Sequence, residues 1–494
     1  MSNIRRSAGM WLNYEGRKGR MGVTLAACAM ILGLSACADE GPRDPIGITA
    51  VSHGVETGAE RRARLTSAGQ ARADSRDPWF AGAAIADEPS AALLARQVLE
   101  QGGNAADAAA ATYFGLAVTY PAAAGLGGGG VCLVHEAGKK TVDTVSFLTR
   151  NPAGGGAIAV PGNVRGFALI HARYGKLPWG SLVAPAERLA ATGTPVSRAT
   201  ARHLAASASL IEASPELKKI FSNDRGEIAG ELDIVTRINL AATLAQIRSQ
   251  GVGGFYSGAT AQRLIEASAK VGGALSAEDL RNYRPDVVPA QSFDSGTSRV
   301  WLPSGSLGAG AFAAALWPNA QNAGPAELAE AARRTALQLG APADIERDFG
   351  STSFAAIDGR GGAVACAVTM NGAFGAREVA EGTGVVLAAS PSSPVAGLAS
   401  AFLAPVIVTG ESGEFVRVSG AGAGAPKGAA AIQHVARNAQ SIEAAEAALE
   451  AGPADIQSSA NAIVCPDGLA SGSCGFAINP RGNGMAVTGI AAGG

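Results

Sequence analysis

A run of four glycines at residues 127–130 is the first feature of the sequence that could take part in chemistry. Glycine-rich loops bind phosphate when Gly-Lys-Ser or Gly-Lys-Thr follows, because the lysine and the hydroxyl complete the site. An apolar segment at residues 131–135 follows here instead, and the spacing of a dinucleotide-binding fingerprint is absent. The run therefore indicates close packing of backbones, and alone it predicts no nucleotide site.

The cysteines and histidines have no spacing typical of a metal site, and we expect neither a metal nor another cofactor. Cys465 and Cys474 flank a segment rich in proline and glycine, so in an oxidising compartment we expect them to form a disulfide. Cys132 and Cys366 lie in apolar, strand-like segments, which favours buried thiols. The five histidines are scattered singly, as surface or core histidines are.

The N-terminal residues resemble a bacterial lipoprotein signal. Basic residues precede an apolar run at 21–34, which ends in Leu-Ser-Ala-Cys at 34–37. A basic segment, a short apolar run and small residues at the cut define a secretory signal. We expect removal of residues 1–36, lipidation of Cys37, and anchoring at the outer membrane facing the periplasm. A plain secretory signal, cut after an alanine, is the alternative.

Composition and charge exclude several classes of protein. The chain has 494 residues, a formal net charge of −1, and 47% apolar residues. Because neutralising phosphates requires a basic surplus, we expect no nucleic-acid partner. The apolar content argues against wholesale disorder. The sequence contains no run of 18 apolar residues, which is about the length that a membrane-spanning helix requires. Contact with a membrane is therefore expected through the lipid anchor only.

Periodic patterns predict the elements that must position the chemistry. Strand patterns occur near both ends of the sequence, and helical patterns dominate the middle. This order predicts a layered α/β protein whose sheets combine early and late segments. The expected elements are a linker at 37–75, helices at 90–101 and 104–118, strands at 131–135 and up to 147, helices across 161–340, a hairpin of 352–358 with 363–370, helices within 427–450, and closing strands.

Several motifs, taken together and in order, resemble the γ-glutamyltranspeptidase family. The resemblance implies an N-terminal-nucleophile hydrolase αββα sandwich, two stacked sheets between helical layers, with a helical middle segment. It also implies a precursor that cuts itself into a large subunit at 76–350 and a small subunit at 351–494. The motifs are Gly-Gly-Asn-Ala-Ala-Asp at 102–107, Pro121, Gly-Leu-Gly-Gly-Gly-Gly at 125–130, Val-Pro-Gly at 160–162, Tyr-Gly-Lys-Leu-Pro-Trp at 174–179, Phe-Tyr-Ser-Gly at 255–258, and Leu280 with Tyr283, Arg284 and Pro285.

The family's segment at the cut aligns without gaps to residues 351–375. The alignment implies cleavage between Gly350 and Ser351, with Ser351 as the nucleophile where the family normally has threonine. Thr369 would orient the nucleophile, and Asn371 would help to hold the site. The backbone N–H groups of Ala423 and Gly424 fall where the family has a Gly-Gly pair, and they would form the oxyanion hole.

A chain-terminal serine has its own base, which explains why no histidine is needed beside Ser351 in the sequence. An α-amine has an ordinary pKa of about 7.7–8.0 and can take the proton of the hydroxyl near neutral pH. Gly350 before the cut tolerates a strained backbone, which would help the Ser351 hydroxyl reach the Gly350 carbonyl carbon.

Four positions depart from the family's substrate clamp. The arginine for the α-carboxylate falls at Leu148, and the aspartate for the α-ammonium falls near Ser393. The serine pair that helps to bind the carboxylate falls at Ala401 and Phe402. Arg150 is then the candidate substrate-binding cation. Because charge-assisted hydrogen bonds contribute about 1.5–3 kcal/mol each, we expect weak recognition of γ-glutamyl groups.

Three functions remain open. The chain is expected to be an autoprocessed γ-glutamyltransferase or glutathione hydrolase that acts on small γ-glutamyl compounds. The second hypothesis is an amidase of the same fold that acts on another acyl-amide substrate. The third is an uncut, catalytically silent lipoprotein that binds a ligand or a partner.

Overall fold

The computed structural model describes residues 79–319, 323–341, 350–392, 394–454, 458–469 and 474–491. The chain divides into two units, Met1–Ala63 and Arg64–Gly494, and the described residues all belong to the second. The expected signal peptide, Cys37 and the linker at 37–75 lie outside the described residues. Within the described ranges, no helix has both the length and the apolar character that crossing a membrane requires.

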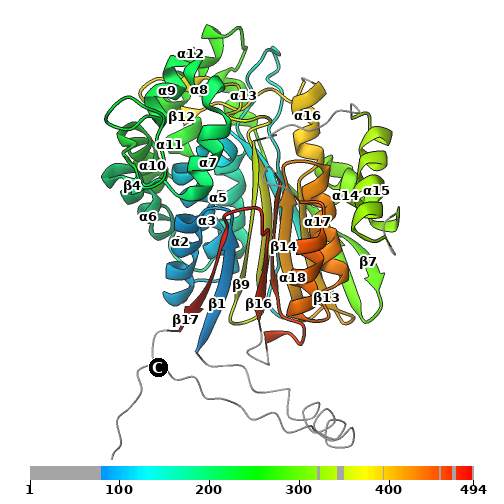
Figure 1. Ribbon diagram of the computed structural model, residues 1–494. Helices are drawn as coiled ribbons and strands as arrows, with labels where there is room; N and C mark the ends of the chain where they lie inside the picture. The colour runs from blue at the N-terminus through cyan, green and yellow to red at the C-terminus, as the bar shows by residue number, and fades with distance from the viewer. Residues whose placement is uncertain are drawn as a thin grey trace, which may run out of the picture. The chain divides into compact units, whose positions relative to one another are not determined.

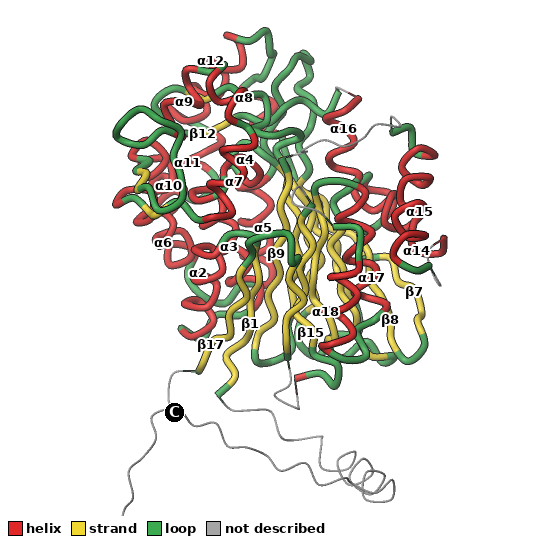
Figure 2. The backbone as a smooth tube through the Cα atoms, in the orientation of Figure 1, coloured by secondary structure: helices red, strands yellow, loops and turns green. Residues whose placement is uncertain are grey.

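Two antiparallel sheets form the centre of the second unit (Figures 1 and 2). In the described residues the first sheet has the order β17-β1-β9-β10-β2-β3-β6. The N-terminal strand β1 therefore lies between the C-terminal strand β17 and the later strand β9. Its strands are β1 (Phe80–Ala86), β2 (Gly129–His135), β3 (Val142–Phe147), β6 (Asp286–Pro289), β9 (Ser351–Asp358), β10 (Ala363–Thr369) and β17 (Met485–Ile490).

The second sheet has the order β16-β15-β14-β13-β8-β7 in the same part of the chain. It also combines segments from both sides of residue 350, because β7 and β8 precede that residue and the other strands follow it. Its strands are β7 (Gln291–Ser295), β8 (Ser298–Leu302), β13 (Ala404–Gly410), β14 (Val416–Ala423), β15 (Ser459–Val464) and β16 (Gly475–Ile478).

A helical layer covers the outer face of each sheet, so the expected αββα sandwich is confirmed (Figure 1). The first layer centres on α3, whose residues are all buried and mostly small, so neighbouring backbones can approach closely. It includes α2 (Pro89–Glu100), α3 (Ala105–Thr119), α5 (Asn163–Tyr174), α6 (Trp179–Thr192) and α10 (Ile238–Gln250). The second includes α14 (Ala309–Asn319), α15 (Pro325–Gln338), α17 (Pro426–Arg437) and α18 (Ile442–Ala451).

Shorter elements join these layers and border the candidate site. The helical ones are α4 (Pro121–Ala124), α7 (Arg198–Ala206), α8 (Ala208–Glu212), α9 (Pro215–Phe221), α11 (Gly253–Tyr256), α12 (Gly258–Lys270), α13 (Ala277–Asn282), α16 (Pro394–Ala401) and the 3₁₀ turn η1 (Gly305–Leu307). Two small ribbons pair β4 (Thr194–Pro195) with β5 (Ile234–Val235), and β11 (Val379–Ala380) with β12 (Val385–Val386).

Helices dominate residues 161–340, as expected, but residues 286–302 form strands that the helical pattern did not predict. Three strands, β6, β7 and β8, lie there and pair within the two sheets. They are four or five residues long, and β7 forms one edge of its sheet with partly exposed side chains. Such short strands contain too few alternations to give a clear period in the sequence.

The described residues contain two disulfides, and one of them corrects the sequence-based expectation. Cys132 and Cys366 are bonded to each other rather than being separate thiols. They are direct partners in the register of β2 and β10, a pairing that their separation of 234 residues concealed. Cys465 and Cys474 form the second disulfide.

Candidate functional site

Ser351 is the first residue of β9, and its side chain faces the second sheet. Alternation along the strand fixes this direction. Ser353, two residues later, donates a hydrogen bond to the Ala421 carbonyl oxygen of β14 at 2.8 Å and also contacts the Ser459 hydroxyl. Ser351 therefore lies at the end of the inter-sheet space, with 8% of its surface exposed.

Thr369 lies directly opposite Ser351 in the β9–β10 register. The Ser351 hydroxyl donates a hydrogen bond to Thr369 Oγ1 at 2.9 Å, and the Asn371 N–H donates to the same oxygen at 2.9 Å. Thr369 Oγ1 in turn donates to the Gly350 carbonyl oxygen at 3.3 Å. The Met370 N–H donates to that carbonyl at 2.8 Å, so the bond before Ser351 is already polarised by two donors.

Gly350 and Asn371 hold backbone conformations that suit these residue types. Gly350 has φ +56°, and a Cβ there would come within 2.0 Å of the Gly372 carbonyl oxygen. Asn371 has φ +61°, a region that asparagine tolerates better than most residues. Its side-chain amide donates to Thr149 Oγ1 and to the Ala389 carbonyl, each at 2.8 Å. Asn371 thus connects the end of β10 to the segment after β3.

Ala423 and Gly424 lie at the end of β14. Ala423 belongs to a small apolar cluster with Ala421 and Ala367, on the face of β14 that meets the first sheet. It pairs in register with Ser459, which contacts Ser353. Both candidate oxyanion residues are therefore near the nucleophile end of the sandwich, and their role toward a substrate stays a prediction.

A pocket of about 100 Å³ opens beside Ser351. Its lining includes a carboxylate, a guanidinium, an imidazole and an amide, together with the Ser351 hydroxyl. Arg202 and His203 come from α7, and no local pattern in the sequence indicates that either would line the Ser351 pocket. The lining residues are Asp87, Tyr120, Ala199, Arg202, His203, Ala206, Ser351, Ser458, Ser459, Gly482 and Asn483.

Hydrogen bonds hold the polar groups of this pocket in place. The Tyr120 hydroxyl and His203 Nδ1 are 3.0 Å apart. Arg202 Nη1 donates to Asn483 Oδ1 at 3.1 Å. Asp87 accepts hydrogen bonds from the Thr352 hydroxyl at 2.7 Å and from the Asn461 amide at 2.6 Å. The carboxylate is therefore attached to strands of both sheets.

Glu88, the residue after Asp87, helps to hold the segment that carries Asp87. It is buried, and its carboxylate accepts hydrogen bonds from the Ala91 N–H at 3.0 Å and the Thr119 hydroxyl at 2.7 Å. Burial raises the pKa of Glu88, while the hydrogen bonds from Thr119 and Ala91 oppose that rise. The contacts tie the start of α2 to the end of α3 and so fix the turn that carries Asp87.

The raised pKa of Glu88 predicts that the stability of the folded protein depends on pH. The folded protein holds the Glu88 proton more tightly than the unfolded chain does, so stability falls as pH rises from about the ordinary value of 4.5 through the folded pKa. Glu88→Gln should therefore gain stability relative to wild type as pH rises. Urea unfolding at pH 4.5 and 7.5 measures this, with partly exposed Glu100→Gln as control. If the difference in unfolding free energy between Glu88→Gln and wild type were the same at both pH values, this prediction would be wrong.

Comparison with known proteins shows a family match over part of the chain. Residues 91–321 match the family model described as Gamma-glutamyltranspeptidase. Over this stretch, a little under half of the chain, the sequence is similar to the γ-glutamyltranspeptidase family. The family expected from the sequence motifs is thereby confirmed.

Two known proteins are similar to this chain over part of their length. Scoloptoxin SSD14 from Scolopendra dehaani is 38% identical over 220 residues, which make up 41% of this chain and 38% of the relative. Glutathione hydrolase 2 from Arabidopsis thaliana is 34% identical over 223 residues, 42% of this chain and 38% of the relative. The chain thus spans about two fifths of the length of these relatives.

The solved structure shows the fold alone. Cephalosporin acylase from Bacillus halodurans superposes with a TM-score of 0.64 at 19% identity, covering 83% of this chain and 96% of that chain.

The γ-glutamyltranspeptidase clamp positions are occupied differently here. Leu148 packs against the inter-sheet cluster near Ala423. Arg150 donates to Asp286 Oδ2 at 2.9 Å and lies over the Tyr283 ring, and it is not among the residues that line the Ser351 pocket.

The other clamp positions offer no charged group in the described residues. Phe402 is buried edge-to-face against Phe312 in the second helical layer. Phe402 is not among the residues that line the Ser351 pocket. Ala401 ends α16, and Ser393 lies outside the described residues.

Proposed function

We propose that this chain is an autoprocessed acyl-transfer enzyme of the γ-glutamyltransferase and glutathione hydrolase type, with Ser351 freed as nucleophile by cleavage after Gly350. The observation that carries the proposal is the chain of hydrogen bonds from the Ser351 hydroxyl to Thr369 and from Thr369 to the Gly350 carbonyl. The relatives named glutathione hydrolase support the reaction class.

Self-cleavage follows from this geometry as an N-to-O acyl shift. The Ser351 oxygen attacks the Gly350 carbonyl carbon, and the negative charge that develops on the carbonyl oxygen receives hydrogen bonds from the Met370 N–H and the Thr369 hydroxyl. The C–N bond then breaks, and the Ser351 nitrogen takes up a proton in place of the one its hydroxyl lost. Water hydrolyses the resulting ester, leaving a Gly350 carboxylate and a free Ser351 amine and hydroxyl.

Turnover would reuse the same groups. The freed α-amine, with an ordinary pKa near 7.7–8.0, takes the proton of the hydroxyl as Ser351 attacks the acyl-amide carbonyl. The amine of the substrate leaves, and water or an acceptor amine then removes the acyl group from Ser351. The N–H groups of Ala423 and Gly424 would stabilise the oxyanion formed in each step.

A second candidate is an amidase for another acyl group, and the clamp positions favour it. Leu148 and Phe402 supply no charge, and Arg150 is engaged by Asp286. A panel of γ-glutamyl and other acyl anilides tests both functions. Turnover of at least one donor by the cleaved protein supports the enzyme proposal. A cleaved protein that turns over none would favour a catalytically silent protein of this fold.

The Cys132–Cys366 disulfide predicts an unusual result on gels. Cys132 precedes the proposed cut and Cys366 follows it, so the bond would keep both fragments joined. A denaturing gel of thiol-blocked, cleaved protein should show one band without reductant and two with it. Replacing Cys132 and Cys366 by alanine should give two bands in both lanes. Replacing Cys465 and Cys474 is the control, since both follow the cut. Two bands from wild type without reductant would contradict the prediction.

We further propose that Cys37 is lipidated and anchors the protein at the outer membrane, facing the periplasm. The lipobox-like sequence at 34–37 supports this. Cys37→Ala should release soluble protein, because a lipid chain supplies the membrane affinity. Membrane fractionation after a salt wash measures the release, with Cys465→Ala as the control. Retention of the Cys37 variant in the membrane would contradict the anchor.

A further inference from the structure

Arg202 is the arginine in the pocket beside Ser351. Its guanidinium is exposed, and Nη1 donates one hydrogen bond, at 3.1 Å, to the neutral Asn483 amide oxygen. A guanidinium has five N–H donors in a planar fork that matches a carboxylate. One donor of Arg202 is thus engaged by a neutral group, and no carboxylate in the described part of the chain forms an ion pair with it.

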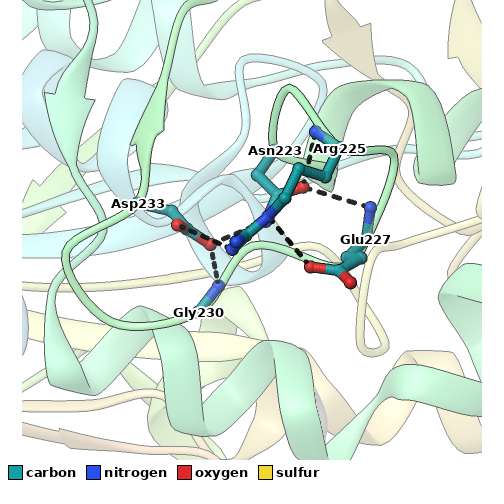
Figure 3. Close-up of polar contacts among 5 residues, drawn as sticks. All are labelled: Asn223, Arg225, Glu227, Gly230 and Asp233. Atoms are coloured by element: carbon teal, nitrogen blue, oxygen red, sulfur yellow. Dashed lines mark hydrogen bonds and ion pairs between the residues drawn. The ribbon is translucent and has the colours of Figure 1, made fainter.

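The loop at residues 222–233, between α9 and β5, holds the start of α7, the helix that carries Arg202. Figure 3 shows this loop closed by Asn223 and Asp233, whose side chains are 3.0 Å apart, and by an Arg225–Glu227 ion pair at 3.2 Å. The Gly230 N–H and the Asn223 amide also hold the pKa of Asp233 below its usual value. The Val196 N–H bonds to the Asp233 carbonyl at 2.9 Å, which fixes the chain just before α7.

Contacts at the start of α7 complete this support. Ser197 caps the helix through the Thr200 N–H at 3.2 Å. Arg198 forms an ion pair with Glu231, which belongs to the same loop, at 3.1 Å. The backbone position of Arg202 is therefore fixed before any ligand enters, which lowers the cost of ordering it on binding.

Asp87, the carboxylate of the pocket, is already occupied by the protein. It accepts the Thr352 hydroxyl at 2.7 Å, the Ser353 N–H at 3.4 Å and the Asn461 amide at 2.6 Å. A carboxylate has about four acceptor positions, so three of them are in use. The pocket therefore has a cation to offer a ligand, and little capacity for an ammonium group.

We propose that Arg202 binds a carboxylate on the acyl group of the substrate, and that the site prefers carboxyacyl amides without an α-ammonium. This inference rests on the proposed function and deepens it. Because one water needs only about 10–15 Å³ of such space, the pocket of about 100 Å³ has room for several waters. A short chain that ends in a carboxylate fits such a space, with its amide carbonyl at Ser351.

The test compares three p-nitroanilides of similar length: glutaryl, γ-glutamyl and butanoyl. Wild type should turn over the glutaryl donor with the lowest KM. Arg202→Gln should raise that KM about 10- to 100-fold, the range expected for one charge-assisted hydrogen-bonded pair, and Arg202→Lys should recover part of the loss. The butanoyl KM should change less than twofold. Arg188→Gln, an exposed arginine on α6, is the charge-matched control.

Glutarate binding, measured by calorimetry, needs no turnover and separates this inference from the proposed function. Wild type should bind glutarate at least tenfold more tightly than Arg202→Gln. If it does while no anilide is hydrolysed, the carboxylate site stands and the proposed function fails. If butanoyl anilide is hydrolysed but Arg202→Gln affects both donors equally, or if Arg150→Gln alone raises the glutaryl KM, the inference is overturned and the enzyme proposal stands.

Discussion

Ser351→Ala is expected to leave one uncut chain with no turnover of any acyl anilide. The variant removes the oxygen that attacks Gly350, and it keeps the backbone of β9 intact. The loss should be complete within detection, because cleavage is what exposes the α-amine that serves as the base. Denaturing gels run with reductant, together with anilide assays, measure both effects.

Two variants in the same strand act as controls for Ser351→Ala. Ser351→Thr should still be cut, since threonine presents the same hydroxyl. Ser353→Ala removes a buried hydroxyl on the same face, bonded to Ala421, and it should be cut at the wild-type rate. Full processing of Ser351→Ala would mean that another residue is the nucleophile.

Thr369→Val has the second-largest expected effect. Thr369 accepts the Ser351 hydroxyl and donates to the Gly350 carbonyl, so valine removes both contacts at nearly constant volume. Losing one preorganised donor to a developing oxyanion typically slows a reaction about 10²- to 10³-fold. We expect the half-time of cleavage to lengthen by at least about 100-fold, as measured by time-resolved gels of freshly folded protein.

The matched control is Thr352→Val on the neighbouring residue. Thr352 is also buried, but its hydroxyl bonds to Asp87 on the other face of β9. Its loss should lower stability by about 1 kcal/mol and leave the cleavage rate within a few fold of wild type. Equal slowing by both substitutions would indicate general distortion of β9, and the positioning role of Thr369 would be wrong.

Elements with local signals could be predicted from the sequence. Asn104 forms a capping box with Asp107 at the start of α3, and Ser276 forms one with Asp279 at α13. The hairpin of β9 and β10 begins one residue before its predicted start. These features depend on residues three or four positions apart, or on a short glycine turn, so a single sequence contains them.

Long-range pairings could not be predicted in the same way. Arg202 meets the Ser351 pocket through the packing of α7, and Cys132 meets Cys366 through strand register. Neither contact has a local signal, because each depends on how segments far apart in the chain pack. Arg150 was the expected cation because it is close in sequence to Leu148, while the structure pairs it with Asp286.

N-terminal sequencing of the smaller fragment tests the central claim most directly. The fragment from cleaved, reduced wild-type protein should begin Ser-Thr-Ser-Phe, starting at Ser351. A first residue of Thr352, or a cut elsewhere in the chain, would contradict the assignment of Ser351 as the freed nucleophile.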